Sequence, residues 1–311
     1  DLEHDSGMAA PTPLPFELAL GPFRVEEAAA FGIMRSRLRA NDLSSPHHGV
    51  RMLGRAGVDI DERAAAFLPL LRRDEVFSHV TAALLLGLRL PLRLQTAPLH
   101  VTVITEHRTD GVARARRRPG VIGHRADHRE TAVSTTGFPV TDAIATWLDL
   151  APMLSVEEII VAGDGLVRRR HPLAEPRELV ERVESTSRLR GIRSIRTAMP
   201  FIRPRTDSGR ETQLRLLLVS CGIREPEVNG AIEDEAGRII AHGDLVWRHE
   251  RVIVEYEGDH HRTDRRQFSI DIDRIGRLEA AGWRVIRVDA ALFARPDALV
   301  PRIRHALTTS R

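Results

Sequence analysis

The sequence predicts a mixed α/β chain of several domains, with both α+β and α/β character, and two features support this prediction. Of its 311 residues 42% are apolar, which is enough to fill more than one hydrophobic core. Stretches with helical periodicity also alternate with short apolar runs rich in β-branched residues, as expected for helices mixed with strands. We expect a winged helix-turn-helix at 8–58, a mixed α/β middle domain at 59–200 and a C-terminal α/β domain at 201–311. Residues 1–7 precede Met8 and are interpreted as a cloning remnant.

The first domain is predicted from a helix at 25–31, a turn at Gly32, a second helix at 34–40 and a loop running into a strand at 41–53. This order is typical of a winged helix-turn-helix and resembles the N-terminal segment of AbiEi-type antitoxin proteins. The second helix is the one that such domains present to the major groove of DNA. Its expected DNA-binding residues are Arg35, Arg37 and Arg39. The alternative is a small helical module that docks a protein.

The middle domain is predicted to mix helices and strands, and the stretch 200–208 reads as a linker because it holds Pro200, Pro204 and Ser208. Periodicity predicts helices at 61–71, 79–88, 140–150, from Ser155, at 176–183 and at 189–199, and strands at 99–104 and 121–124. Its histidines, among them His100, His107, His124 and His128, lie near arginines and read as surface or hydrogen-bonded residues.

Composition narrows the class of protein. The formal charge is only +3, and all 46 basic residues are Arg, so net charge alone does not indicate a nucleic-acid partner. Local arginine runs at 114–118 and 168–170 suit phosphate better. Cys221 is the only cysteine, which predicts a reducing, cytoplasmic location and no structural zinc site. No apolar run is long enough to span a bilayer, so no membrane partner is expected.

The most informative stretch is the apolar run 252–257, because it holds two glutamates. Side chains alternate along a strand, so Glu255 and Glu257 leave one face while the apolar residues leave the other. A hairpin returning from the preceding apolar run would add Asp244. Carboxylates that share a face repel one another unless a cation lies between them, which favours Mg²⁺ or Mn²⁺. The alternative is an edge strand with a solvated face.

Two predicted helices flank this strand. The stretch 209–222 reads as a helix ended by Gly222, with Glu211 at the edge of its buried face. The stretch 268–281 reads as a second helix, and 283–288 reads as the strand that follows it. The predicted order is therefore a helix, a strand pair that ends in the carboxylate strand, a helix, a strand and a final helix.

Residues 207–307 resemble the very-short-patch-repair-like branch of the PD-(D/E)XK nuclease superfamily, as found in actinobacterial proteins. The residues that carry the resemblance are Glu211, Gly243-Asp244, Glu255-x-Glu257, Gly258 to Arg262, Asp273-Arg274 and Gly282 to Val285. The resemblance implies a restriction-endonuclease-like domain. Two positions depart from the pattern: Gly243 stands where the family has Pro, and Glu257 where much of the superfamily has Lys.

The resemblance also implies metal-dependent hydrolysis of a DNA phosphodiester. Asp244 and Glu255 would hold Mg²⁺ or Mn²⁺, and Glu257 would act on the attacking water or bind a second ion. Glu211 would reach a metal-bound water from its helix. His260, or its neighbour His261, would offer a proton to the leaving oxygen. The resemblance also implies that Arg262, Arg265 and Arg266 would contact phosphate.

Two functions follow from these residues, both with DNA as the partner. The first is an active endonuclease of a defence or repair system. The second is a catalytically inactive, antitoxin-like regulator that binds DNA on a nuclease-derived scaffold, which the glutamate at position 257 favours. A third alternative is a partner-docking protein that contacts no nucleic acid. The sequence leaves open a homo-oligomer or a partner from a defence system, the form of the nucleic-acid substrate and any recognition sequence.

Overall fold

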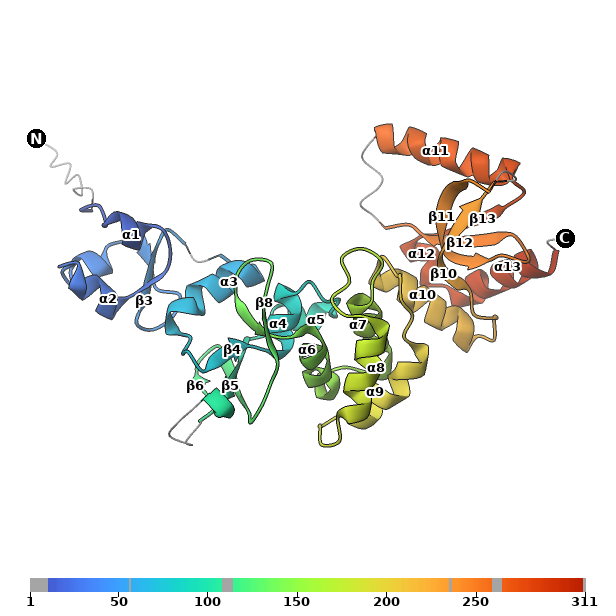
Figure 1. Cartoon of the computed structure of the whole chain (residues 1–311). Helices are drawn as coiled ribbons and strands as arrows, with labels where there is room; N and C mark the ends of the chain where they lie inside the picture. Colours follow the sequence, from blue (N-terminus) through green and yellow to red (C-terminus); the bar gives the residue numbers. More distant parts are fainter. Residues whose placement is uncertain (1–10, 56, 108–113, 235–236, 259–264, 310–311) are drawn as a thin grey trace, which may run out of the picture. The chain divides into compact units, whose positions relative to one another are not determined.

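The computed structural model describes residues 11–55, 57–107, 114–234, 237–258 and 265–309, and side chains of the last range from Asp273 onward. Within these residues the protein is a mixed α/β chain with three sheets and thirteen α-helices (Figure 1). It divides into two compact units. One comprises 1–87 and 92–146, and the other comprises 88–91 and 147–311. No described helix combines the length and the apolar character that a membrane crossing needs.

The N-terminal segment forms a small three-stranded sheet with the strand order β1-β3-β2. Its core is made by Leu18, Phe23, Ala28 and Leu38, each at most 5% exposed. At the start of α2 the Glu27 side chain accepts a hydrogen bond from the Arg24 N–H at 2.9 Å. The elements are α1 (Phe16–Ala19), β1 (Phe23–Arg24), α2 (Val25–Ala30), the 3-10 turn η1 (Arg37–Arg39), β2 (Leu43–Ser44) and β3 (Val50–Leu53).

The prediction of a second helix at 34–40 is wrong, because the structure has only the 3-10 turn η1 there. Leu38 is the only fully buried side chain of this stretch. A helix nucleus is costly, and one buried anchor does not stabilise two helical turns in so short a segment. Arg37 also folds back onto Asp42 through two hydrogen bonds of 2.8 and 2.7 Å, which fixes the chain as a turn.

The second sheet has six strands in the order β6-β7-β5-β4-β9-β8. Its central strand β5 is buried along its whole length and pairs parallel with β7, with Thr102 opposite His124. The strands are β4 (Glu75–Phe77), β5 (Leu99–Ile104), β6 (Arg117–Arg118), β7 (Val121–Ala126), β8 (Thr131–Val133) and β9 (Pro139–Thr141). The helices around them are α3 (Ile60–Phe67), α4 (His79–Leu85) and α5 (Leu92–Gln95), with 3-10 turns η2 (Leu68–Leu70) and η3 (Thr105–His107).

A helical segment follows, and part of it packs on the C-terminal domain. The α7 helix begins with a capping box between Ser155 and Glu158, as the sequence predicts. Its buried Asp164 accepts hydrogen bonds from Arg215 and Thr212 of α10, both at 2.9 Å. The helices are α6 (Ala143–Asp149), α7 (Val156–Leu166), α8 (Pro176–Ser185), α9 (Ile192–Ala198) and α10 (Gly209–Ser220), with 3-10 turns η4 (Ala151–Met153) and η5 (Met199–Phe201).

The C-terminal sheet is mixed, in the order β10-β11-β12-β13. The first three strands are antiparallel, and β13 pairs parallel with β12 because α11 carries the chain back across the sheet. The strands are β10 (Glu227–Glu233), β11 (Ile239–Trp247), β12 (Val252–Tyr256) and β13 (Arg284–Val288), and the remaining helices are α11 (Arg265–Ala280), α12 (Ala290–Phe293) and α13 (Pro296–Thr309).

Helices cover both faces of this sheet (Figure 1). Val252 and Val254 face α10 and α13, where they pack with Leu218 and Ile303. Ile253 faces α11, where it packs with Leu278 and other apolar residues. The alternation predicted for the strand 252–257 is therefore present, and Glu255 leaves the face of Ile253.

Candidate functional site

Three carboxylates approach one another from separate elements of the C-terminal domain. Glu211 lies in the first turn of α10, Asp244 on β11 and Glu255 on β12. The register pairs Leu245 with Val254, and its continuation sets Asp244 opposite Glu255 on the same face. The backbone N–H of Tyr256 donates to Asp244 Oδ2 at 2.9 Å, which holds that side chain against β12.

The charges of this cluster are poorly compensated. Burial is the largest of the effects that raise the pKa of Asp244 to about 8; the charges of Glu211 and Glu255 act in the same direction, and the Tyr256 N–H and Arg274 act against them. Burial also raises the pKa of Glu211. A buried carboxyl group with other carboxylates beside it favours a proton or a bound cation. The arrangement therefore has the electrostatic character of a cation site.

Arg274 supplies one positive charge to the cluster. Its guanidinium, from α11, donates to both oxygens of Glu255, at 2.8 Å from Nη1 and 2.6 Å from Nη2. Glu255 is only 8% exposed, so this two-point contact is the partner that its buried charge requires. Any metal ion that takes an oxygen of Glu255 competes with Arg274.

Glu211 has a structural role beside its place in the cluster. Its Oε2 accepts hydrogen bonds from the Asp207 N–H at 2.9 Å and from Asn229 Nδ2 at 3.1 Å. Its own N–H is capped by the Ser208 hydroxyl at 3.2 Å. Glu211 therefore helps to fix the start of α10 against β10, and this accounts for part of its burial.

Glu257 has a different partner. It forms an ion pair with Arg287 of β13, and its N–H donates to the Val288 carbonyl at 2.8 Å. The side chains of Glu257 and Arg287 are 37% and 43% exposed. Glu257 therefore lies at the solvent edge of the sheet, where Arg287 compensates its charge.

Two arginines that the sequence prediction left out lie near the cluster. Burial lowers the pKa of Arg89 and the charge of Glu211 raises it, so the two groups are close. The hydrogen bond to Asp207 raises the pKa of Arg169, and the charges of Glu211 and Asp244 add to this. Arg169 belongs to the arginine run 168–170, which was a signal in the sequence. Arg89 lies in an apolar stretch and gave no such signal.

Several predicted residues are not placed. His260, His261 and Arg262 lie outside the residues that the structure describes. Arg265 and Arg266 open α11, but their side chains lie outside the described part. The predicted contacts of these residues with DNA and with the leaving oxygen therefore stay predictions.

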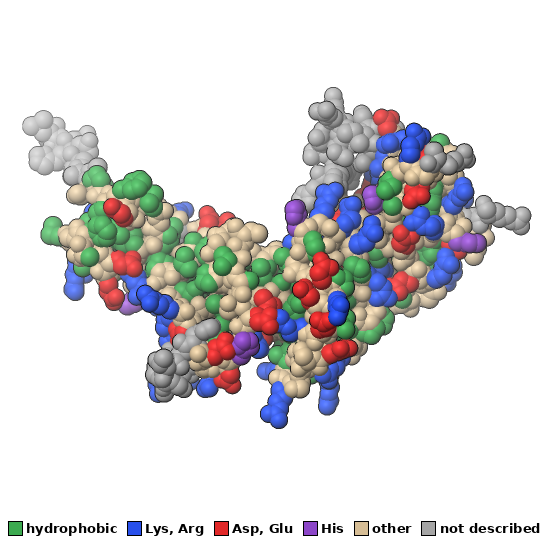
Figure 2. Space-filling view, viewed as in Figure 1, with side chains coloured by type: hydrophobic (Ala, Val, Ile, Leu, Met, Phe, Trp, Pro, Cys, Tyr) green, Lys and Arg blue, Asp and Glu red, His purple; other side chains and the backbone are tan. Residues whose placement is uncertain are grey.

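The N-terminal arginines differ among themselves. Arg37 is only 10% exposed and is held by Asp42, so it does not reach outward as expected. Arg35 and Arg39 are exposed. Figure 2 shows hydrophobic side chains on the surface of the same segment. The most exposed large ones there are Phe16 at 74%, Met34 at 73% and Leu20 at 72%.

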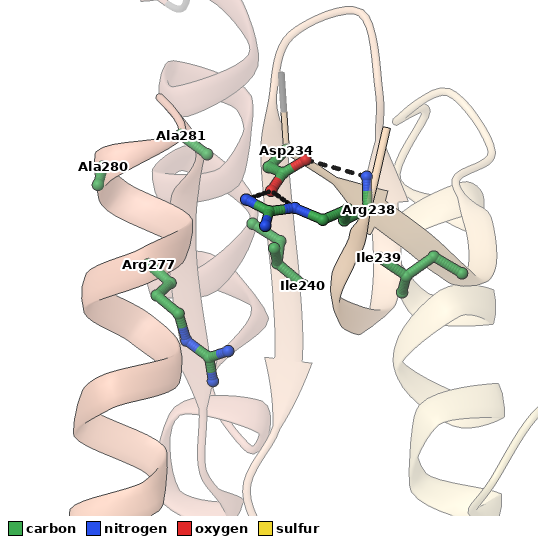
Figure 3. A pocket seen from close by; sticks show the side chains of 7 residues that line it. All are labelled: Asp234, Arg238, Ile239, Ile240, Arg277, Ala280 and Ala281. Atoms are coloured by element: carbon green, nitrogen blue, oxygen red, sulfur yellow. Dashed lines mark hydrogen bonds and ion pairs between the residues drawn. The ribbon is translucent and has the colours of Figure 1, made fainter. Parts of the chain in front are cut away.

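A hollow of about 750 Å³ opens between the β10–β11 hairpin and the end of α11 (Figure 3). Arg238 is held there by Asp234, with its Nε at 2.9 Å from the carboxylate, while Arg277 lines it from α11. The carboxylates of the cluster are not among its lining residues, so it is a separate feature of the surface. Its lining residues are Asp234, Arg238, Ile239, Ile240, Arg277, Ala280 and Ala281.

These features define a mixed α/β protein with a buried carboxylate cluster in its C-terminal domain. The chain is similar to the uncharacterized protein MT2308 of Mycobacterium tuberculosis (strain CDC 1551 / Oshkosh) and to the uncharacterized protein Rv2248 of strain ATCC 25618 / H37Rv. It is 28% identical to each over 123 residues, or 39% of this chain and 45% of the relative. The matched part thus spans less than half of these relatives. No family model and no solved structure matches the chain.

Proposed function

We propose that the C-terminal domain is a metal-dependent endonuclease that hydrolyses DNA phosphodiesters. The observation that supports this most is that burial, together with the nearby charges of Glu211 and Glu255, raises the pKa of Asp244 to about 8. Acidic residues without a functional role usually lie in solvent, where their carboxylates stay charged and their pKa values are not raised.

The donor set suits a hard divalent cation such as Mg²⁺ or Mn²⁺, because all its donors are oxygens. Asp244 and Glu255 are the residues that would hold the ion. When bound, such an ion stabilises negative charge on the scissile phosphate and makes a coordinated water more acidic. Glu211 would orient that water by hydrogen bonding. Arg169, beside the cluster, would bind a phosphate oxygen.

The test is cleavage of supercoiled plasmid DNA in the presence of Mg²⁺ or Mn²⁺. Glu255→Gln and Asp244→Asn keep the size of each side chain and remove its charge, so each should abolish nicking. Glu233→Gln is the matched control, since Glu233 is an exposed carboxylate at the end of β10 in the same sheet. Nicking that survives both Glu255→Gln and Asp244→Asn would refute the proposal.

A second function, a regulator that binds DNA without cutting it, is supported by two ion pairs. Arg274 occupies both oxygens of Glu255, and Arg287 compensates Glu257. Retention of DNA without cleavage under Mg²⁺, Mn²⁺ or Co²⁺ would support the regulator. That binding should weaken steeply with salt, because phosphate contacts release counterions.

A further inference from the structure

Three histidines meet in the first compact unit, far from one another in sequence. His79 is the first residue of α4, His100 lies on β5 and His124 on the neighbouring strand β7. One ring nitrogen from each can be chosen so that all three nitrogens lie within 4.8 Å of one another. The parallel β5–β7 register explains the closeness of the last two, because it sets His124 beside Thr102, two residues from His100.

The three rings lie almost parallel. The centroids of His79 and His124 are 3.6 Å apart at an interplanar angle of 14°, and those of His100 and His124 are 5.1 Å apart at 12°. The Nδ1 of His100 is 2.9 Å from the Nε2 of His124. A neutral imidazole has one donor and one acceptor nitrogen. In this contact one ring therefore donates a hydrogen bond and the other accepts it.

His100 is the side chain that points most clearly to a ligand. It is only 2% exposed, and its Nε2 has no hydrogen-bond partner among the described residues. A buried polar atom without a partner costs free energy that the fold would not retain without a compensating contact. Protonation does not solve this, because burial lowers the pKa of His100 to about 4 and that of His79 to about 2. At neutral pH the imidazoles are neutral, which is the form that ligates metals.

Hydroxyl groups hold two of the histidines in place. His79 Nδ1 is 3.0 Å from the Ser78 hydroxyl, which accepts a hydrogen bond of 2.7 Å from Thr102. The backbone N–H of His100 donates to the Thr81 hydroxyl at 2.8 Å. His79 also adopts a left-handed backbone with φ of 48°, which a histidine rarely does. Such supporting contacts are what orient ligating histidines in metal sites.

We propose that His79, His100 and His124 bind a divalent transition-metal ion, with Zn²⁺ as the preferred species. Imidazole nitrogens suit zinc at bond lengths of about 2.0 to 2.1 Å, which sets two ligands of a tetrahedral site about 3.3 Å apart. The three nitrogens already lie within 4.8 Å of one another, which is near this separation. Three protein ligands leave the fourth position to water.

This site and the carboxylate cluster differ in ligand chemistry. Nitrogen donors select zinc-like ions, while carboxylate oxygens select Mg²⁺ or Mn²⁺. The histidine site therefore does not depend on the proposed nuclease function, and either can fail without the other. No local sequence signal predicts this site, because the spacing of the three histidines matches no zinc motif.

The test is zinc binding by the full chain after treatment with a chelator. We expect one Zn²⁺ to stay bound through desalting, and Co²⁺ in its place to give the visible absorption of a four-coordinate ion. His79→Asn tolerates the left-handed backbone, and His124→Gln alters a half-buried ring, so both variants should fold. Each should weaken zinc binding by roughly tenfold or more.

Two control variants separate the possible sources of binding. His128→Gln removes an exposed histidine of the same unit, which contacts Glu106, and should leave zinc binding unchanged. Glu255→Gln removes a carboxylate of the other site and should also leave it unchanged. Equal zinc stoichiometry and affinity in the wild type, His79→Asn and His124→Gln would overturn the proposal, as would a wild type that retains no zinc.

Discussion

Arg274 and Glu255 form a two-point ion pair across the C-terminal domain, with nitrogen–oxygen distances of 2.8 and 2.6 Å. The arginine comes from α11 and the glutamate from β12, so the pair also ties the helix to the sheet. Arg274 is thus the cation that contacts Glu255 directly. This gives the pair a measurable consequence for metal binding.

Arg274→Ala should strengthen Mn²⁺ binding and weaken the metal-free fold. Without its partner, Glu255 carries a buried and uncompensated charge, at a cost on the order of 1–3 kcal/mol. A divalent ion would then face no competitor for the Glu255 oxygens. Isothermal titration with Mn²⁺ and the thermal midpoint with and without the ion would measure both effects.

Arg277→Ala is the matched control, because Arg277 is exposed on the same helix and lines the separate hollow. It should change neither the Mn²⁺ affinity nor the thermal midpoint by much. If Arg274→Ala binds Mn²⁺ no better than Arg277→Ala does, Arg274 does not guard a metal site.

The raised pKa of Asp244 predicts how stability depends on pH. The folded protein keeps a proton on Asp244 up to about pH 8, while the unfolded chain loses it near 3.8. The folded state therefore binds more protons between these values, and stability from this group falls as pH rises, by up to about 1.4 kcal/mol per pH unit. Urea unfolding of chelator-treated protein from pH 5 to 8 would show the decline, and saturating Mn²⁺ should remove it.

Asp244→Asn should stabilise the metal-free protein at pH 8. The amide keeps the acceptor oxygen for the Tyr256 N–H and removes the charge that Glu211 and Glu255 oppose. The gain should shrink toward pH 5, where Asp244 is already neutral. A midpoint of urea unfolding that falls in Asp244→Asn at pH 8 would contradict the assigned electrostatics.

Local sequence signals located much of the C-terminal domain. The helix predicted at 209–222 corresponds to α10 (Gly209–Ser220) and the helix predicted at 268–281 overlaps α11 (Arg265–Ala280), because apolar periodicity and the stop at Gly222 act within a few turns. The alternation that put Glu255 on the face opposite Val252 and Val254 is also confirmed. These features depend on neighbours in sequence.

Partners distant in sequence were not predictable in the same way. Arg274 meets Glu255 only because α11 crosses the sheet, and Arg89 approaches Glu211 from an apolar stretch. His79 was expected only as the start of a helix, and no spacing rule joined it to His100 and His124.

Arg35→Ala combined with Arg39→Ala tests whether the N-terminal segment contacts DNA. Both arginines are exposed, whereas Arg37 is occupied by Asp42. If each binds a phosphate, the slope of log affinity against log salt should fall by about 1 for each arginine removed. Electrophoretic mobility of duplex DNA across a salt series measures it. An unchanged slope, equal to that of Arg177→Ala with Arg193→Ala on α8 and α9, would favour protein docking through the apolar residues.

Asp164→Ala should be among the most destabilising changes in the second unit. Asp164 and Arg215 are 0% and 1% exposed, and they join α7 to α10 at 2.9 Å. Asp164 also accepts from the Arg203 N–H at 2.7 Å, so its removal takes an acceptor from that N–H and from the Thr212 hydroxyl, and leaves the buried Arg215 with Glu225 as its remaining carboxylate partner. Breaking such a pair costs about 3–5 kcal/mol.

Asp234→Ala, which breaks the more exposed pair with Arg238, should cost about 1 kcal/mol or less in the same urea titration. Equal losses in the two variants would mean that the buried pair does not hold α7 to α10, and the helical segment would then be free to separate from the carboxylate domain.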